Sequence, residues 1–170
     1  MLDETMVTET PPLYGGYGRL GTQVRVPITG SRAKRILHGV INIDTGAVLL
    51  LITDVWNEQT HQYFLAMIRS HWRGRRIIVL EDRGTPHTTG DTRECAKGLH
   101  IALRFLPTAT PKLNAMDHLW RNVKGRALAN RPTKTIDLSA YNACQHILQL
   151  SPKQRLQTAG VLSGNFWLTR

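Results

Sequence analysis

The chain has 170 residues but only two cysteines, Cys95 and Cys144, and it contains no Cys-x-x-Cys pair. The missing cysteine pairs exclude a zinc finger or zinc ribbon, and two isolated cysteines are typical of a reduced, cytosolic protein. The longest apolar run, residues 47–52, is far shorter than the roughly 20 residues that a membrane-spanning helix needs. The first residues carry neither a basic region nor a hydrophobic signal stretch. We therefore expect a soluble cytoplasmic protein with no membrane partner.

Acidic residues are also scarce: 12 Asp and Glu stand against 22 Lys and Arg, which gives a net charge of +10. Such an excess attracts polyanions, most commonly nucleic acid, although a functionally silent basic surface or a membrane-surface role gives the same composition. The basic residues extend from Arg19 to Arg170, with clusters at 32–35 and 73–76. This spread favours a broad face that follows a nucleic-acid backbone over a detachable basic tail.

The length and a hydrophobic content of 41% predict one folded domain over residues 1–170. Two β-branched runs flank the turn Asp44-Thr45-Gly46 and predict a β-hairpin. The apolar run 76–80 predicts a strand buried on both faces. The pattern predicts strands at 1–10, 23–27, 35–43, 47–55, 76–80 and 101–106, and helices at 58–72, 88–99, 115–130 and 136–150, with a short helix in the last twenty residues. A hairpin followed by alternating helices and strands predicts a mixed sheet with helices packed on it.

Three acidic residues stand where this order would bring them together. Asp3 lies in the first strand, Asp82 follows strand 76–80, and Asp117 lies in the first turn of helix 115–130. Ligand sites in such sheets lie beyond the carboxyl ends of the strands. Carboxylates gathered there suit Mg²⁺, and two such ions about 3.5–4 Å apart catalyse phosphodiester transfer. Each acid also has an ordinary interpretation, as a terminal residue, a turn residue and a partner of the helix dipole respectively.

Three sequence blocks resemble the catalytic domain of the Tc1/mariner superfamily, in its bacterial insertion-sequence branch. The blocks are LDET at 2–5, RIIVLEDRGTPHTT at 76–89 and FLPTATPKLNAMDHLWRNVKGRALANRP at 105–132. The third block is the most specific, and the 34 residues between Asp82 and Asp117 match the family spacing. The sequence departs from the family pattern at Arg83, where Asn is usual, and at Ala115, where Pro is usual. Its third acid is Asp, as in the mariner branch, whereas bacterial relatives usually carry Glu.

The resemblance implies an α/β ribonuclease-H-like fold, with a mixed five-stranded sheet and helices on both faces. It also implies a Mg²⁺-dependent DNA endonuclease and strand transferase, the catalytic core of a transposase. Asp3, Asp82 and Asp117 would be the catalytic residues and would bind two Mg²⁺ ions, for which Mn²⁺ would substitute. The residues expected to contact DNA are His87, Lys112, Arg121, Lys124 and Arg126. For His87 a hydrogen bond within its own loop is the alternative, and for the three residues on helix 115–130 it is an ordinary solvated helix face.

The implied partners are double-stranded DNA at transposon ends and, as target, a TA dinucleotide. Family members carry an N-terminal helix-turn-helix module. Because this chain begins two residues before Asp3, we expect that module to be absent or separately encoded. We further expect a homodimer on DNA in the bacterial cytoplasm, associated with the nucleoid. Two alternatives stay open: an inactive DNA-binding remnant of a transposase, and a ribonuclease-H-fold nuclease that acts on junctions or hybrids.

The remaining histidines show no spacing typical of metal ligands, so we interpret them as structural or solvent-facing. These are His38, His61, His71, His100, His118 and His146. Trp120 is expected to lie in the hydrophobic core.

Overall fold

The computed structural model describes residues 1–23, 25–28 and 30–168. Its first three strands form an antiparallel sheet in the order β1 (Leu2–Thr8), β2 (Lys34–Ile41) and β3 (Val48–Thr53). The predicted hairpin between β2 and β3 is confirmed. In its turn the side chain of Asn42 accepts hydrogen bonds from the backbone N–H groups of Asp44 and Thr45. Gly46 has a φ of +73°, a conformation that glycine adopts without steric cost.

The two later strands, β4 (Ile77–Glu81) and β5 (Ile101–Phe105), pair in parallel. The sequence predicted one five-stranded mixed sheet, but the described residues form a three-stranded and a two-stranded sheet. Strand β1 contacts β4 without sharing a ladder of backbone hydrogen bonds with it. Five of the six predicted strands therefore occur, while their hydrogen bonding divides them into two sheets. Strand β4 is also less buried than predicted, because Ile78 is 47% exposed.

The helices agree with the predicted ranges in most places. The helix expected at 88–99 consists of α2 (Thr85–Thr88) and α3 (Gly90–Gly98), and the helix expected at 115–130 is α4 (Ala115–Asn122), which continues as the π-helix η2 (Val123–Leu128). The others are α1 (Glu58–His71), the short 3₁₀ helix η1 (Pro111–Leu113), α5 (Ile136–Gln149) and α6 (Pro152–Thr158). Among the described residues, no helix is both long and apolar enough to span a bilayer.

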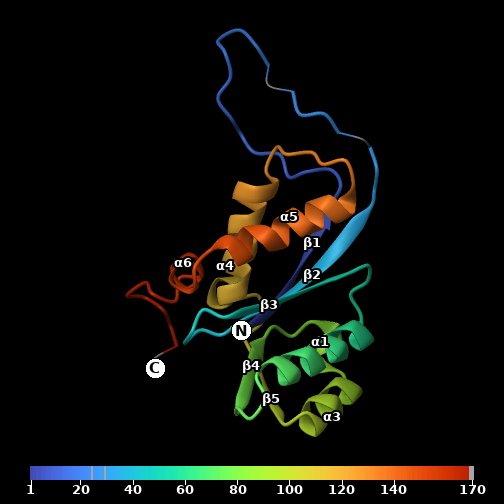
Figure 1. The fold of residues 1–170 in the computed structure, drawn as a ribbon, viewed down its shortest axis with the longest axis vertical. Helices are drawn as coiled ribbons and strands as arrows, with labels where there is room; N and C mark the ends of the chain where they lie inside the picture. Colours follow the sequence, from blue (N-terminus) through green and yellow to red (C-terminus); the bar gives the residue numbers. More distant parts are fainter. Residues whose placement is uncertain (24, 29, 169–170) are drawn as a thin grey trace.

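Helices cover both faces of the β1–β3 sheet, and each face has its own hydrophobic core. Side chains along β2 alternate between the two: Leu37 and Ile41 pack with Trp120 of α4, whereas Val40 packs with Phe64 of α1. In Figure 1, α4 and α5 lie over the β1–β2 pair, and α1 and α3 lie at the end of the molecule that holds β4 and β5. This arrangement, with helices on each side of the sheet, confirms the α/β class and the helices on both faces.

The segment 9–33, which links β1 to β2, has no helix or strand among its described residues. It projects from the body as the long blue loop in Figure 1. The strand predicted at 23–27 is therefore wrong for the four described positions, and Val24 lies outside the described residues. Leu20 and Tyr17 in this loop are fully exposed, so apolar residues here do not indicate a strand packed on a core.

Candidate active site

Asp3, Asp82 and Asp117 line one cavity of about 300 Å³, although they come from separate elements. Asp3 lies on β1, Asp82 directly follows β4, and Asp117 lies in the first turn of α4. The loop between β5 and α4 completes the wall of this cavity with residues 106–111 and 114. The predicted convergence of the three acids is thus present in the fold.

The pairing register of β1 decides which acid enters this cavity. Asp3 pairs with Gly39 of β2, and Glu4 pairs with His38. A Cβ on Gly39 would lie 2.6 Å from the Trp120 side chain of α4, so this position faces α4. Because successive strand residues point to opposite faces, Asp3 lies on the side of α4 while Glu4 faces α1.

Asp82 is held by two hydrogen bonds to the same oxygen. Its Oδ1 accepts from the backbone N–H of Gly84 at 2.9 Å and lies 2.7 Å from Nδ1 of His87. The hydrogen bond from His87 keeps the pKa of Asp82 below its usual range, against the effect of partial burial. Asp82 is therefore an oriented, ionised carboxylate at the exposed mouth of the cavity.

Asp117 and its helix are fixed by polar contacts at the start of α4. The side chain of Asn114 accepts a hydrogen bond from the Met116 N–H and donates one to the carbonyl of Leu2, which ties the helix start to β1. One turn further along, Arg121 donates to Oδ2 of Asp117 through its Nε at 2.8 Å. Arg121 thus occupies one oxygen of the candidate ligand.

Asp3 is an acid of this cavity whose pKa is raised. Burial, together with the nearby carboxylates of Glu4, Asp117 and Asp82, raises its pKa to about 8. Negative groups that crowd a partly buried position in this way are stabilised by a bound cation. Carboxylate oxygens are also the ligands that Mg²⁺ prefers. The residues of the cavity therefore fit a divalent cation.

The three aspartates do not form a compact cage. Among the described residues, one group of three metal-binding side chains has its ligand atoms within 4.8 Å of one another, and it consists of Glu4, His61 and His87. The aspartates are more widely spaced. A wide spacing suits ligands arranged around two ions rather than around a single one.

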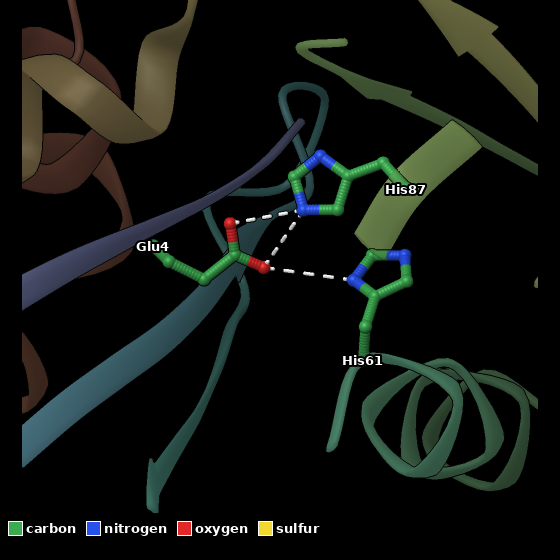
Figure 2. A group of neighbouring side chains, drawn as sticks. All are labelled: Glu4, His61 and His87. Atoms are coloured by element: carbon green, nitrogen blue, oxygen red, sulfur yellow. Dashed lines mark hydrogen bonds and ion pairs between the residues drawn. The ribbon is translucent and has the colours of Figure 1, made fainter. Parts of the chain in front are cut away.

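A buried polar cluster lies next to this cavity, on the α1 side of β1. We call Glu4, His61 and His87, drawn in Figure 2, the Glu-His cluster. The two carboxylate oxygens of Glu4 lie 3.1 and 3.2 Å from Nε2 of His87. His38 of β2 is also 3.3 Å from Glu4, and its other nitrogen lies 3.0 Å from the Thr53 hydroxyl.

His61 and Glu81 are the unsatisfied members of this region. Nδ1 of His61 lies 3.5 Å from Glu4, and its Nε2 lies 3.4 Å from Oε2 of Glu81. Neither contact has hydrogen-bond geometry, so the polar atoms of both side chains are buried without a partner. Burial raises the pKa of Glu81 to about 8 and lowers the pKa of His61 below its usual value.

The structure corrects the predicted role of His87. This side chain is 1% exposed and its two nitrogens face Asp82 and Glu4 inside the protein, so it is not presented to a DNA phosphate at the surface. Burial opposes its charge, but hydrogen bonds with Asp82 and Glu4 outweigh this effect and raise its pKa to about 11. The alternative interpretation, a hydrogen bond within its own loop, is the one that the geometry supports.

The other residues expected to contact DNA lie nearer the surface. Lys112, Arg121 and Arg126 are exposed, and Lys124 is half-buried. The sequence did not indicate Arg83, which is exposed and lines the cavity beside Asp82. It also gave no sign of the Glu-His cluster. Strand alternation could have indicated part of this cluster, because it places Glu4, the neighbour of Asp3, on the opposite face of the sheet.

Comparison with known proteins adds a family and a fold. The model of the DDE superfamily endonuclease family matches residues 1–138. The crystal structure of the Mos1 strand transfer complex has a TM-score of 0.74 and 17% identity, and the match covers 93% of this chain and 49% of that one. The mariner Mos1 paired-end complex with Mg has a TM-score of 0.71 and 19% identity, and the match covers 93% of this chain and 50% of that one. The catalytic domain of Mos1 mariner transposase has a TM-score of 0.65 and 15% identity, and the match covers 93% of this chain and 73% of that one.

This chain therefore spans about half the length of the transposase chains in those complexes. No curated protein matches the sequence. The family match confirms a DDE endonuclease domain, and the fold is the one seen in Mos1 mariner transposase, in agreement with the predicted resemblance; the bacterial branch stays a prediction.

Proposed function

Because the chain belongs to the DDE superfamily of endonucleases, we propose that it is the catalytic core of a DNA transposase. The proposed reaction is metal-dependent phosphodiester cleavage at transposon ends, followed by strand transfer into target DNA. One observation carries this proposal: Asp3, Asp82 and Asp117, which are distant in sequence, line a single open cavity. The similarity to Mos1 structures supports a fold on which this chemistry occurs.

Asp3, Asp82 and Asp117 are proposed to hold two Mg²⁺ ions, for which Mn²⁺ would substitute. When bound, such ions polarise the attacking and leaving oxygens of an in-line displacement at phosphorus. Mos1 structures with Mg and with Mn support the choice of metal. The five strands would act as one mixed sheet at this point, because β1 and β4 lie against each other and deliver Asp3 and Asp82 to the same cavity.

The chain's own residues contribute orientation and charge. His87 holds Oδ1 of Asp82, so Oδ2 is the oxygen that we propose as the metal ligand. Arg121 pairs with Asp117, and we propose that it would move to a DNA phosphate when a cation binds this carboxylate. Arg83 lines the cavity beside Asp82 and is suited to bind the phosphate next to the cleaved bond.

The proposed partner is double-stranded DNA, at the transposon ends and at the target. Lys112, Lys124 and Arg126 would contact its phosphates and would make binding strongly dependent on salt. We also propose a homodimer on DNA, a separately encoded helix-turn-helix subunit that recognises the ends, and action on the nucleoid in the bacterial cytoplasm. The Mos1 complexes include a paired-end complex with the left transposon end, which supports the DNA partner.

The test is nicking of supercoiled plasmid DNA in Mg²⁺ or Mn²⁺. We expect Asp82→Ala and Asp117→Ala each to reduce the rate by at least about 100-fold, since changes in the outer shell of a metal site alone cost about 10–100-fold. His71→Gln is the matched control, because His71 is exposed at the end of α1 and does not line the cavity. It should retain the wild-type rate.

Other outcomes would replace the proposal. If wild type and both aspartate variants are equally inert but still bind DNA, the chain is a DNA-binding remnant. A marked preference for four-way junctions or RNA–DNA hybrids over duplex ends would instead identify a nuclease with the same fold. Nicking that continues in excess chelator would exclude the metal ions from the mechanism.

A further inference from the structure

The Glu-His cluster has the composition and spacing of a transition-metal site. Its three side chains come from β1, α1 and α2 and present ligand atoms within 4.8 Å of one another. A tetrahedral Zn²⁺ with bonds of about 2.0–2.1 Å places neighbouring ligand atoms about 3.3–3.4 Å apart. Oε1 of Glu4 lies 3.2 Å from Nε2 of His87 and 3.5 Å from Nδ1 of His61.

Both histidines also face a second carboxylate with their other ring nitrogen. Nδ1 of His87 lies 2.7 Å from Asp82, and Nε2 of His61 lies 3.4 Å from Glu81. Histidines that bind zinc typically donate their second ring N–H to a carboxylate, which fixes the tautomer and the ring orientation. Two histidines in this arrangement, both facing one glutamate, form the pattern of a built metal site.

The unpaired polar atoms supply an independent reason. Both nitrogens of His61 are fully buried and make no hydrogen bond. An unsatisfied buried polar group costs about 1–3 kcal/mol, so it usually marks a missing partner such as an ion or a water. A cation between Glu4 and His61 would use the free Nδ1 and would be neutralised by the adjacent carboxylates.

We propose that Glu4, His61 and His87 bind one Zn²⁺ or a similar transition-metal ion, separate from the ions of the aspartate cavity. Two imidazole nitrogens and one carboxylate favour zinc over magnesium, because Mg²⁺ is bound mainly by oxygen. The site links α1 and α2 to β1. It also fixes His87, which orients Asp82, and Glu4, which follows Asp3. The proposal does not depend on the proposed transposase activity.

Metal content of the whole chain tests this site directly. The protein is stripped with a chelator, incubated with Zn²⁺, passed over a desalting column and analysed by inductively coupled plasma mass spectrometry. We expect about one zinc per chain for wild type. His61→Gln should weaken zinc binding by more than about 100-fold, since even outer-shell changes cost about 10–100-fold. His71→Gln, the same change at the exposed end of α1, should bind like wild type.

Cobalt provides a second readout that does not depend on activity. Co²⁺ bound in a tetrahedral site absorbs visible light, and His61→Cys should retain the ion while adding a sulfur-to-cobalt band. This variant decides the case if His61→Gln does not fold. Asp117→Ala, which removes a proposed Mg²⁺ ligand, should reduce nicking as stated above and still retain zinc, so failure of the two proposals is distinguishable. Equal zinc content in wild type and His61→Gln, or no zinc in wild type and no cobalt spectrum, would overturn the proposal.

Discussion

Replacing Asp3 by asparagine should stabilise the metal-free protein at neutral pH while it removes activity. The pKa of Asp3 rises from 3.8 to about 8 in the fold because of burial and the neighbouring carboxylates. The fold therefore favours the protonated acid. The stability that this form contributes is complete below pH 4 and is lost as the pH rises towards 8. Asparagine keeps the shape of the side chain and carries no charge.

The pKa rise sets the size of the effect. Each pKa unit corresponds to about 1.36 kcal/mol, so the rise gives an upper limit of about 4 kcal/mol at pH 7. Partial solvent exposure of Asp3 and relaxation of the cavity reduce this value. We expect Asp3→Asn to raise the free energy of unfolding by about 1–3 kcal/mol at pH 7. At pH 4 the gain should be close to zero.

Urea denaturation in chelator-containing buffer at several pH values between 4 and 8 measures this difference. Asp91→Asn, the same change at an exposed position in the first turn of α3, is the control and should show no comparable increase with pH. Mg²⁺ should then stabilise wild type more than Asp3→Asn, which closes the gap. A difference between the two proteins that stays constant from pH 4 to 8 would refute the electrostatic reasoning.

Two further predictions concern α4. Gly39→Ala should destabilise the protein by about 1–3 kcal/mol in urea denaturation, because the new Cβ would lie 2.6 Å from the Trp120 side chain. Gly98→Ala, whose Cβ meets nothing within 4 Å, is the control, and equal stability of the two variants would contradict this packing argument. Arg121→Gln should lower the Mg²⁺ concentration for half-maximal nicking by up to about 5-fold, because it removes an exposed ion pair with Asp117 worth about 0.2–1 kcal/mol. An unchanged or higher Mg²⁺ requirement would show that this ion pair does not compete with the metal.

The elements with a strong local pattern could be predicted from sequence. The hairpin around Gly46 follows from turn chemistry, and α1 follows from apolar spacing, while its capping residue Asn57 is seen only in the structure. The strand expected at 23–27 failed because β-branched residues are a signal only when something packs on them. The division into two sheets could not be predicted from the hydrophobic pattern, since it depends on whether β1 and β4 form backbone hydrogen bonds.

The candidate site was also predictable only in part. Asp3, Asp82 and Asp117 follow from a spacing matched to known blocks, and they do line one cavity. The partners of His87 did not follow, because its contact with Glu4 joins residues 83 positions apart. His61 was interpreted as ordinary because its ligand spacing exists only in three dimensions. Single-sequence reasoning detects spacing along the chain, whereas this cluster is assembled from three elements.

The register of β1 against β2 has a consequence for how this chain tolerates insertions and deletions. Asp3 and Glu4 are chemically similar neighbours, and only their odd or even position along the strand sends one to the cavity and the other to the histidines. Shifting the strand by a single residue would turn both acids to the opposite face. A shift in one direction would bring Glu4 to the cavity and carry Asp3 past it, and a shift in the other would bring Asp3 beside the histidines and carry Glu4 past them. Inserting or deleting one residue in this strand should therefore disrupt both the cavity and the Glu-His cluster. Most changes in the projecting loop 9–33 would leave the side chains of β1 on their present faces.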